Sequence, residues 1–596
     1  MSDFLPISLA EIKQRGWESI DFLFISGDAY VDHPSFGPAI ICRVLESQGY
    51  KVAILPQPDW HNLESFAALG KPNYAVLISG GNLDSMLCHY TAAKKKRSDD
   101  SYTPGGVSGK RPDHATIVYS KCIKKLWPDM PVVIGGIEAS LRRFVHYDYW
   151  EDKLLPSILE DSGADLLIFG MGEKQIVEVA DYFAGGASAE DIHYVNGTAY
   201  LTDRENFDFT SEHVELPSWQ EIKQDRKQFA LAYKKQGREQ DPIRGKTVIQ
   251  QGLKKLLVQN PPAQPLTMAE MDKVYDLDYK RQWHPSYDAL GGIPALEEVK
   301  FSIISSRGCF GSCSFCAIHA HQGRIIQARS HESILREAKL LTTFPDFKGY
   351  IHDVGGPTAN FRHPSCKKQL SVGTCAHRQC LFPEPCPNLD ADHSDYAQLL
   401  NEVRALPGIK KVFIRSGIRY DYLMCDKNQN FFRQMCQHHV SGQLKIAPEH
   451  ISDNVLRYMG KPGKAVYLKF MRNFKRINQE LGLNQFLVPY LISSHPGSTI
   501  QDAIALAEFL RDIRHYPKQV QDFMPTPGSA STAMYYSGVD IETGKNIYVA
   551  KSITDKAMQR ALMQYRNPRN YHLVVKALRL AGRNDLIGKG SKCLVK

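Results

Sequence analysis

The chain has 596 residues, which is too long for one hydrophobic core and predicts about three or four domains. Its 43% hydrophobic and 23% charged residues are typical of a globular protein, and a net charge of +9 does not by itself predict a nucleic-acid partner. The first residues do not show the basic segment followed by an apolar segment that is typical of a secretory signal, so we do not expect secretion. No apolar run of about 18 residues occurs, so we do not expect a membrane partner. Thirteen cysteines, one tight group and several singles, favour metal binding in the cytoplasm over disulfides.

Residues 19–185 predict an α/β fold, because short apolar runs alternate there with amphipathic helical patterns. This alternation is typical of a doubly wound parallel sheet, and we assign it to an N-terminal domain at 1–190. The expected strands cover residues 21–26, 51–55, 74–79, 131–134 and 166–169. Ligands of such sheets bind at the carboxyl ends of strands, which here read Gly80-Gly81, Gly135-Gly136 and Gly170-Met171-Gly172.

These loops contain no G-x-G-x-x-G, so a dinucleotide fingerprint is absent. Their arrangement resembles a cobalamin-binding domain, in which a glycine pair after a late strand lines the cofactor. That family carries the motif D-x-H-x-x-G, whereas here Asp32 and His33 are adjacent. The departure makes cobalamin doubtful, and we expect His33 to be a loop residue of a scaffold or substrate-binding domain.

Basic and aromatic side chains are interleaved at Arg142, Arg143, Tyr147, Tyr149 and Trp150. Such a stretch can stack bases and hold phosphates, which leaves a nucleic-acid partner open. The same side chains suit an interdomain contact, and we favour that interpretation.

The alternation of strand-like and helical patterns weakens at residues 191–295, and we interpret this segment as a connector between two domains. A second, more regular alternation at 296–530 predicts a partial (βα)6 barrel, with strands at 299–305, 349–354, 411–415, 443–447, 485–492 and 519–524. The active site of such a barrel lies at the carboxyl ends of its strands. Residues 531–596 predict a small helical extension that either caps the barrel or contacts RNA.

The loop after the first of these strands holds Cys309, Cys313 and Cys316 at C-x3-C-x2-C spacing. A fully ligated [4Fe–4S] cluster takes four thiolates, so three leave one iron open to a substrate or cosubstrate. A zinc site or free thiols are the alternatives, but zinc favours paired C-x2-C arms and only one such pair occurs here.

This loop on a six-unit barrel resembles the radical S-adenosylmethionine (SAM) superfamily, and the whole chain resembles its uncharacterised YgiQ-type proteins. The resemblance implies that the three cysteines hold a [4Fe–4S] cluster, that SAM chelates the open iron, and that a 5′-deoxyadenosyl radical is formed. It further implies a reductase or a flavodoxin- or ferredoxin-type electron donor. The residues it assigns to SAM binding are Phe315, Gly355, Gly356, Ser416 and Glu449.

The substrate is not indicated by the resemblance. A methylthiotransferase-like or cobalamin-dependent methyltransferase acting on RNA or protein is an alternative, as is a non-enzymatic iron–sulfur redox protein. For Glu449 the alternative is a structural role at a helix N-terminus.

Four further cysteines, Cys366, Cys375, Cys380 and Cys386, fall in a Cys-rich insertion at 360–390 with little helical or strand pattern. A loop so poor in apolar residues needs a cross-link, and four thiolates suit a closed zinc site or an auxiliary iron–sulfur cluster. Unligated thiols are the third possibility.

Overall fold

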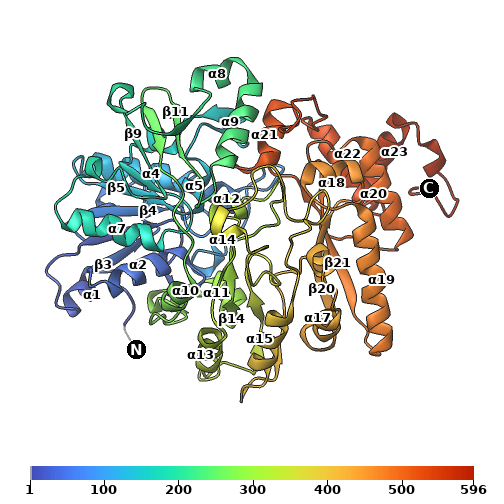
Figure 1. The fold of residues 1–596 in the computed structure, drawn as a ribbon, viewed down its shortest axis with the longest axis horizontal. Helices are drawn as coiled ribbons and strands as arrows, with labels where there is room; N and C mark the ends of the chain where they lie inside the picture. The colour runs from blue at the N-terminus through green and yellow to red at the C-terminus, as the bar shows by residue number, and fades with distance from the viewer. Residues whose placement is uncertain (1–2) are drawn as a thin grey trace.

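The structure, a computed structural model, describes residues 3–596 and consists of two α/β units that lie side by side (Figure 1). The N-terminal unit is coloured blue to green, and the barrel and C-terminal helices run from green to red. No helix within residues 3–596 is both long and apolar enough to cross a bilayer.

The N-terminal unit is built on the predicted parallel sheet. Its five parallel strands stand in the order β3-β1-β4-β5-β8 and are formed by Val52–Pro56, Phe22–Ser26, Ala75–Ser79, Val132–Gly135 and Leu166–Ile168. Alternate strand residues bury against opposite faces, so that Leu23 and Ile25 join one core and Phe22 and Phe24 the other. Burial on both faces explains why these strands read as continuous apolar runs.

Helices cover both faces of this sheet. Helices α2 (Gly37–Ser47) and α7 (Glu173–Ala184) pack on one face, and α4 (Ala115–Leu126) packs on the other. The doubly wound arrangement predicted from the sequence is therefore confirmed, and the carboxyl ends of its strands point towards the barrel (Figure 1).

The interpretation of residues 191–295 as a connector was wrong. Four strands from this segment, β9 (Thr198–Thr202), β10 (His213–Leu216), β11 (Thr247–Gln251) and β12 (Leu256–Gln259), extend the N-terminal sheet to nine. Strand β9 pairs antiparallel with β8, and β11 and β12 form an antiparallel pair. These four strands are short and contain polar residues, so the sequence shows no long apolar run that would identify them as strands.

The second unit is an incomplete barrel of parallel strands, as predicted. Strand β14 (Ser302–Ile304) pairs with β18 (Asp353–Gly355), and β17 (Tyr350–Ile351) pairs with β19 (Lys411–Val412). The remaining strands β20 (Gln443–Glu449), β21 (Phe486–Ser493) and β22 (Gln521–Asp522) form one parallel sheet. The helices that follow and cover these strands include α13 (His331–Leu341), α15 (Ser394–Arg404), α19 (Lys464–Glu480) and α20 (Ile500–Asp512).

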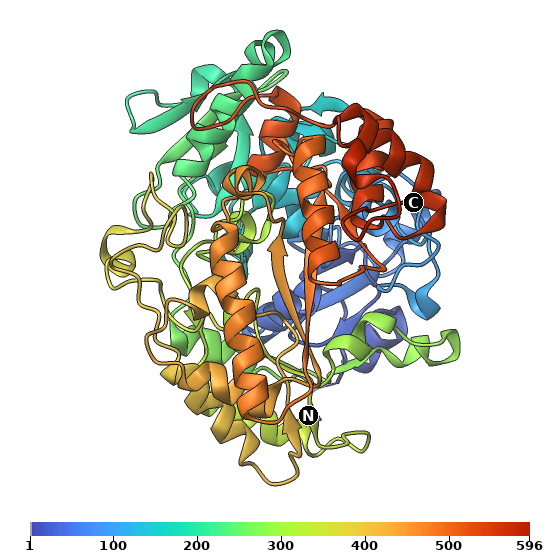
Figure 2. The same ribbon diagram turned by 90° about the vertical axis from the view of Figure 1, so that its right-hand side faces the viewer.

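The C-terminal residues form helices α21 (Ala530–Ser537), α22 (Ile553–Met563) and α23 (Tyr571–Leu580). Helices α22 and α23 share a core with α20, so they cap one side of the barrel, as Figure 2 shows in orange and red.

The basic and aromatic stretch near residue 145 lies against this C-terminal part. The ring of Tyr147 lies 6.0 Å from that of Tyr535 and 5.0 Å from that of Tyr536. Arg142 and Arg143 are buried, and Arg142 pairs with Asp84. This stretch therefore makes the interdomain contact that we favoured.

A buried ion network joins the N-terminal unit to the barrel. The carboxylate of Glu337 on α13 accepts hydrogen bonds from Arg281 (2.7 Å) and Arg329. Burial alone would raise the pKa of Glu337, but the two guanidinium groups outweigh burial and hold the pKa below its ordinary value.

We predict that Glu337→Gln destabilises the protein by about 3–5 kcal/mol, because it leaves two buried cations without their counter-charge. The exposed Glu332→Gln on the same helix is the control and should leave the thermal midpoint unchanged. A carboxyl whose folded pKa is depressed stabilises the fold above its unfolded pKa of about 4.3. The difference between wild type and Glu337→Gln should therefore shrink as the pH falls below about 4; a constant difference would contradict the ion-pair interpretation.

Candidate functional site

A cavity of about 710 Å³ lies between the two units. From the N-terminal sheet it is lined by strand-end loops that include Gly81, Gly136 and Gly170. From the barrel it is lined by the ends of β14, β18 and β19, including Gly355 and Ser416. Both binding edges expected from the sequence therefore face the same space. Its apolar lining includes Phe24, Ile40, Leu77, Ile134, Ile168, Ile176 and Ile304.

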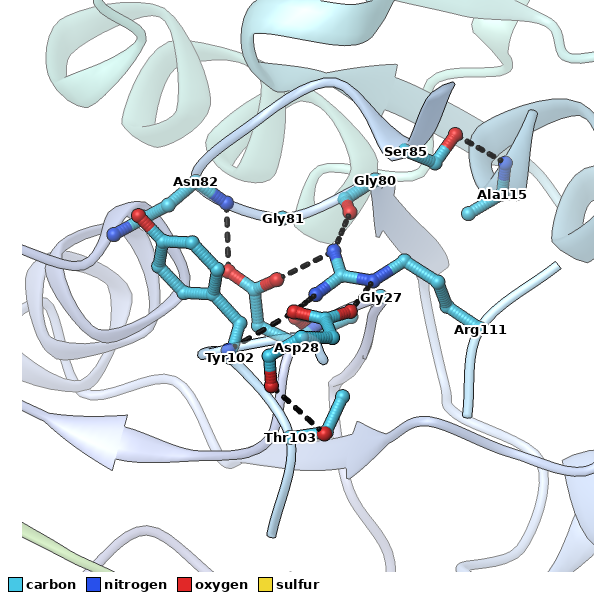
Figure 3. Close-up of polar contacts among 12 residues, drawn as sticks. Gly27, Asp28, Gly80, Gly81, Asn82, Ser85, Tyr102, Thr103, Arg111 and Ala115 are labelled. Atoms are coloured by element: carbon cyan, nitrogen blue, oxygen red, sulfur yellow. Dashed lines mark hydrogen bonds and ion pairs between the residues drawn. The ribbon is translucent and has the colours of Figure 1, made fainter. Parts of the chain in front are cut away.

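The N-terminal side of this cavity is held by a buried guanidinium group (Figure 3). Arg111 pairs with Asp28 (2.7 Å) and Asp100 (2.9 Å) and donates to the carbonyl of Gly80 (3.0 Å). The other carboxylate oxygen of Asp28 accepts the backbone N–H of Asn82 at 2.7 Å. One cation thus fixes two adjacent strand-end loops, and Asn82 is placed at the cavity wall.

His33 is buried and is not part of the cavity wall. Its Nδ1 accepts the backbone N–H of Ser35 at 3.1 Å, and its Nε2 lies 3.4 Å from a guanidinium nitrogen of Arg281. Burial, with the charge of Arg281, holds the pKa of His33 well below its ordinary value. The ring has a structural role in this loop and does not point a nitrogen at the cavity.

On the barrel side, the predicted residues Gly355, Gly356 and Ser416 lie together in the cavity wall. A Cβ atom on Gly355 would lie 2.1 Å from Ser416 Oγ, so only glycine allows these two strand ends to meet. Asp353 accepts the backbone N–H groups of Arg415 (2.7 Å) and Ser416 (3.2 Å). Burial raises the pKa of the Asp353 carboxyl, while these N–H groups oppose the shift.

The cysteine loop lies beside this wall and holds its thiols close together. The backbone N–H of Cys316 donates to the carbonyl of Cys313 at 3.0 Å, and Cys309 Sγ lies 3.9 Å from Thr358 Oγ1. Burial and the two neighbouring thiols raise the pKa of Cys316 to about 12. No three His, Cys, Asp or Glu side chains in residues 3–596 are arranged to hold a single metal ion.

A cation missed in the sequence analysis contacts this loop. Arg419 is buried and donates from Nη1 to Cys313 Sγ at 3.0 Å, while its Nε donates to Asp421 at 2.7 Å. A Cβ atom on Gly311 would lie 2.4 Å from the same Nη1, so the glycine lets the cation reach the sulfur. Cys313 is buried, and Cys309 and Cys316 are partly buried. Three such thiols with a cation on one of them fit an anionic thiolate-ligated cluster, because the cation offsets part of its negative charge.

Glu449 and Phe315 do not line the cavity. Glu449 ends β20 with φ of 68°, which is strained for a residue with a Cβ atom, and the next helix starts only at Asp453. The helix N-terminus interpretation of Glu449 is therefore wrong. Burial raises the pKa of its carboxyl against the charges of Lys461 and Arg419. Phe315 packs on α18 (Asp453–Met459), with its ring 6.1 Å from His495.

The four cysteines of the Cys-rich insertion also come together. Cys366, Cys375, Cys380 and Cys386 line one small cavity of about 20 Å³, separate from the large one. Cys375 is exposed, and the other three are partly buried.

Comparison with known proteins decides the family. The family described as "Radical SAM N-terminal" matches residues 4–302, "Radical SAM superfamily" matches 303–510, and a domain of unknown function (DUF3362) matches 518–596. A UPF0313 protein of Clostridium perfringens (strain 13 / Type A) is 56% identical over 593 residues, which cover 100% of this chain and 89% of the relative. The chain belongs to the UPF0313 family of radical SAM proteins.

A UPF0313 protein of Clostridium botulinum (strain 657 / Type Ba4) is also 56% identical, over 100% of this chain and 92% of the relative. Among solved structures, the cobalamin-dependent SAM radical enzyme OxsB, with aqua-cobalamin bound, has a TM-score of 0.50 and 11% identity, over 96% of this chain and 74% of that one. The radical SAM methyltransferase TsrM from Kitasatospora setae has a TM-score of 0.48 and 14% identity, over 94% and 100%. At these identities only the fold is shared with OxsB.

Membership confirms the prediction of a radical SAM protein and supports a [4Fe–4S] cluster and SAM as cofactors. Two cavity residues of this UPF0313 protein were missed in the sequence analysis, Arg307 and Glu173, which form a buried ion pair across the cavity. Arg307 directly precedes the cysteine loop, but its partner is 134 residues away, so the pairing gave no local signal.

We predict that Arg419→Gln lowers the reduction potential of the cluster, because a cation beside a ligating sulfur stabilises the added electron. The expected shift is on the order of 60 mV, a tenfold change for a one-electron couple. A redox titration followed by electron paramagnetic resonance measures it.

Asp421→Asn is the matched variant that tests the direction of the shift in reduction potential. It removes an acid next to Arg419, so the potential should rise, and Arg419→Lys should stay near wild type. Shifts in the same direction for Arg419→Gln and Asp421→Asn would mean that loop disruption, not charge, sets the potential.

Proposed function

We propose that this protein is a radical SAM enzyme that cleaves SAM reductively and acts on a substrate held in the cavity between its two units. The observation that carries the proposal is the continuity of this cavity from the barrel glycines at 355 and 356 to the strand-end loops of the N-terminal sheet. An enzyme that generates a radical needs its substrate next to the SAM site and away from water.

The residues fit the cofactors that the family implies. Cys309, Cys313 and Cys316 would bind three irons of a [4Fe–4S] cluster, which leaves the fourth open. When bound, the cluster supplies the electron for cleavage of the SAM sulfonium, giving methionine and a 5′-deoxyadenosyl radical. Arg419 offsets the negative charge of the cluster, and the Gly355–Gly356 backbone allows a ligand to approach closely.

Polar groups without protein partners mark where ligands bind. Among the described residues, the buried Ser416 Oγ, Arg307 Nη2 and Glu173 Oε2 have no hydrogen-bond partner. All three residues line the cavity, and burying an unpaired polar group is costly. In this proposal Ser416 bonds a hydroxyl or carboxylate of SAM, and the Arg307–Glu173 pair orients the substrate.

The test is the triple variant Cys309→Ala, Cys313→Ala and Cys316→Ala, reconstituted anaerobically with iron and sulfide. We expect it to lose SAM cleavage, measured as 5′-deoxyadenosine formed after reduction with dithionite. Cys436→Ala is the matched control, because this buried thiol packs in the barrel core away from the loop and should leave cleavage intact. SAM cleavage by the triple variant would refute the proposal.

Cobalamin-dependent methyl transfer is the second candidate, favoured by the glycine-rich loops Gly135-Gly136 and Gly170-Met171-Gly172 in the cavity wall. These loops leave open space over the sheet edge, as a large flat ligand requires. Cobalamin would supply a methyl group carried on cobalt. His33 would give cobalt no ligand, because its ring nitrogens face Ser35 and Arg281.

We predict that Met171→Trp, which fills this part of the cavity, lowers retained cobalamin at least tenfold after incubation with hydroxocobalamin and gel filtration. Met268→Trp on an exposed helix is the matched control and should retain it. If wild type retains no cobalt while it still cleaves SAM, the second candidate fails and the first stands. A reconstituted cluster in a wild type that neither binds nor cleaves SAM would instead indicate a redox protein.

A further inference from the structure

The Cys-rich insertion is held in place although it has almost no regular structure. Its helix α14 (Gln369–Val372) has only four residues. The carboxylate of Asp241 accepts the backbone N–H (2.6 Å) and hydroxyl (2.8 Å) of Thr374, and Arg244 donates to the Thr374 carbonyl at 3.0 Å. Arg324, from the loop that follows the three SAM-cluster cysteines, donates to the carbonyl of Cys375 at 3.0 Å.

These anchors bring four thiols to one place. All four cysteines line the same small cavity, and Ser365 Oγ lies 3.1 Å from Cys380 Sγ. The backbone N–H of Cys386 donates to the carbonyl of Cys380 at 2.9 Å.

The spacing of these cysteines differs from that of a structural zinc site. Zinc sites usually take two arms with two to four residues between the cysteines of each arm. Here eight, four and five residues separate consecutive cysteines, so only Cys375 and Cys380 form such an arm. Four thiolates on an irregular loop are also the ligand set of a [4Fe–4S] cluster.

The position of this group relative to the SAM-cluster loop points to electron transfer. Cys309 and Cys380 both pack against a single apolar cluster formed by Phe310, Ile326, Phe361, Leu381 and Tyr422. The rings of Phe310 and Phe361 stack with centroids 3.8 Å apart, and that of Tyr422 lies 5.1 Å from Phe361. The two cysteine groups therefore both border one buried aromatic and apolar cluster.

We propose that Cys366, Cys375, Cys380 and Cys386 ligate a second iron–sulfur cluster that passes one electron from an external carrier to the cluster at Cys309, Cys313 and Cys316. The second cluster is reduced by one electron from a low-potential carrier protein and is reoxidised when that electron moves to the first cluster. Four ligands leave no iron open, so this cluster transfers electrons and does not bind SAM. The relay rests on the proposed SAM cleavage as its electron acceptor.

The surface above the second group suits an acidic electron carrier. Leu370 and Val372 on α14 are 66% and 61% exposed, which is unusual for apolar side chains. The loop also carries the exposed cations Lys367, Lys368 and Arg378, against two exposed acids, Glu384 and Asp390. An apolar centre with a basic rim favours a small carrier with an acidic surface, and we commit to a flavodoxin-type protein.

The first experiment counts metal. After anaerobic reconstitution, wild type should hold about eight irons per chain, and the variant with Cys366, Cys375, Cys380 and Cys386 all changed to Ser about four. The triple alanine variant should also hold about four, with the spectrum of a reduced cluster that SAM does not perturb. Cys425→Ser is the control, because Cys425 packs on the same apolar cluster outside both groups. One zinc per wild-type chain, or iron unchanged by the four serines, would overturn the proposal.

The second experiment separates the relay from a structural role. With dithionite, which reduces the first cluster directly, the four-serine variant should form 5′-deoxyadenosine at a rate near that of wild type. With reduced flavodoxin as the only donor, its rate should fall at least tenfold. Equal loss with both donors would mean that the loop is only structural. Absence of cleavage in wild type with either donor would count against the proposed function, while the iron counts would still test the second cluster.

The docking surface is tested by the double variant Lys367→Glu, Lys368→Glu. It should raise the flavodoxin concentration needed for half-maximal rate several-fold and leave the dithionite rate unchanged. Lys475→Glu, on the exposed face of α19, is the matched control. A rate that is unaffected at every flavodoxin concentration would place the entry point elsewhere.

Discussion

The Arg307–Glu173 ion pair is the contact on which the shape of the site depends. Glu173 starts α7 at the carboxyl edge of the N-terminal sheet, and Arg307 ends β15 (Ser306–Arg307) directly before the cysteine loop. Both side chains are buried, and Arg307 also donates to Tyr275 Oη at 3.0 Å. Burying two charges costs several kcal/mol per ion before their attraction is counted. An ion pair that only joined two domains could be replaced by apolar side chains. This pair also leaves one donor, Arg307 Nη2, and one acceptor, Glu173 Oε2, without a partner on residues that line the cavity.

Three non-glycine residues with left-handed backbone lie in the cysteine loop or at the ends of β20 and β21. Ser312, Glu449 and Ser494 have φ values of 47°, 68° and 61°, in the left-handed region that favours glycine. One lies in the cysteine loop and the others follow or end β20 and β21. Each such residue costs on the order of 1–3 kcal/mol, and strain of this kind clusters at functional sites. The barrel thus tolerates strain where three strand ends converge on the cysteines, which agrees with a site that must hold its ligands in one geometry.

Sequence alone predicted those parts of the fold and site whose signals are local. Strands such as Phe22–Ser26 are buried on both faces and read as apolar runs, and the three cluster cysteines lie within one short loop. The strands β10 to β12 escaped detection because each has only four or five residues, and β10 and β11 mix polar with apolar side chains. Arg419 escaped because its contact with Cys313 joins residues 106 positions apart, and a lone arginine after a strand has many possible partners.

The second cysteine group lines a small cavity that is separate from the large one, and this separation has a chemical consequence. The cavity is bounded by the N-terminal sheet, whereas the second group reaches the surface through Cys375 and the exposed helix α14. In Figure 2 the yellow loops of this part of the chain lie at the left edge, away from the blue strands of the N-terminal sheet. A substrate and an electron carrier could then bind at once without competing for one opening. The apolar cluster around Phe310 is buried and contacts both Cys309 and Cys380, so in this proposal the electron crosses through packed side chains and needs no opening to solvent.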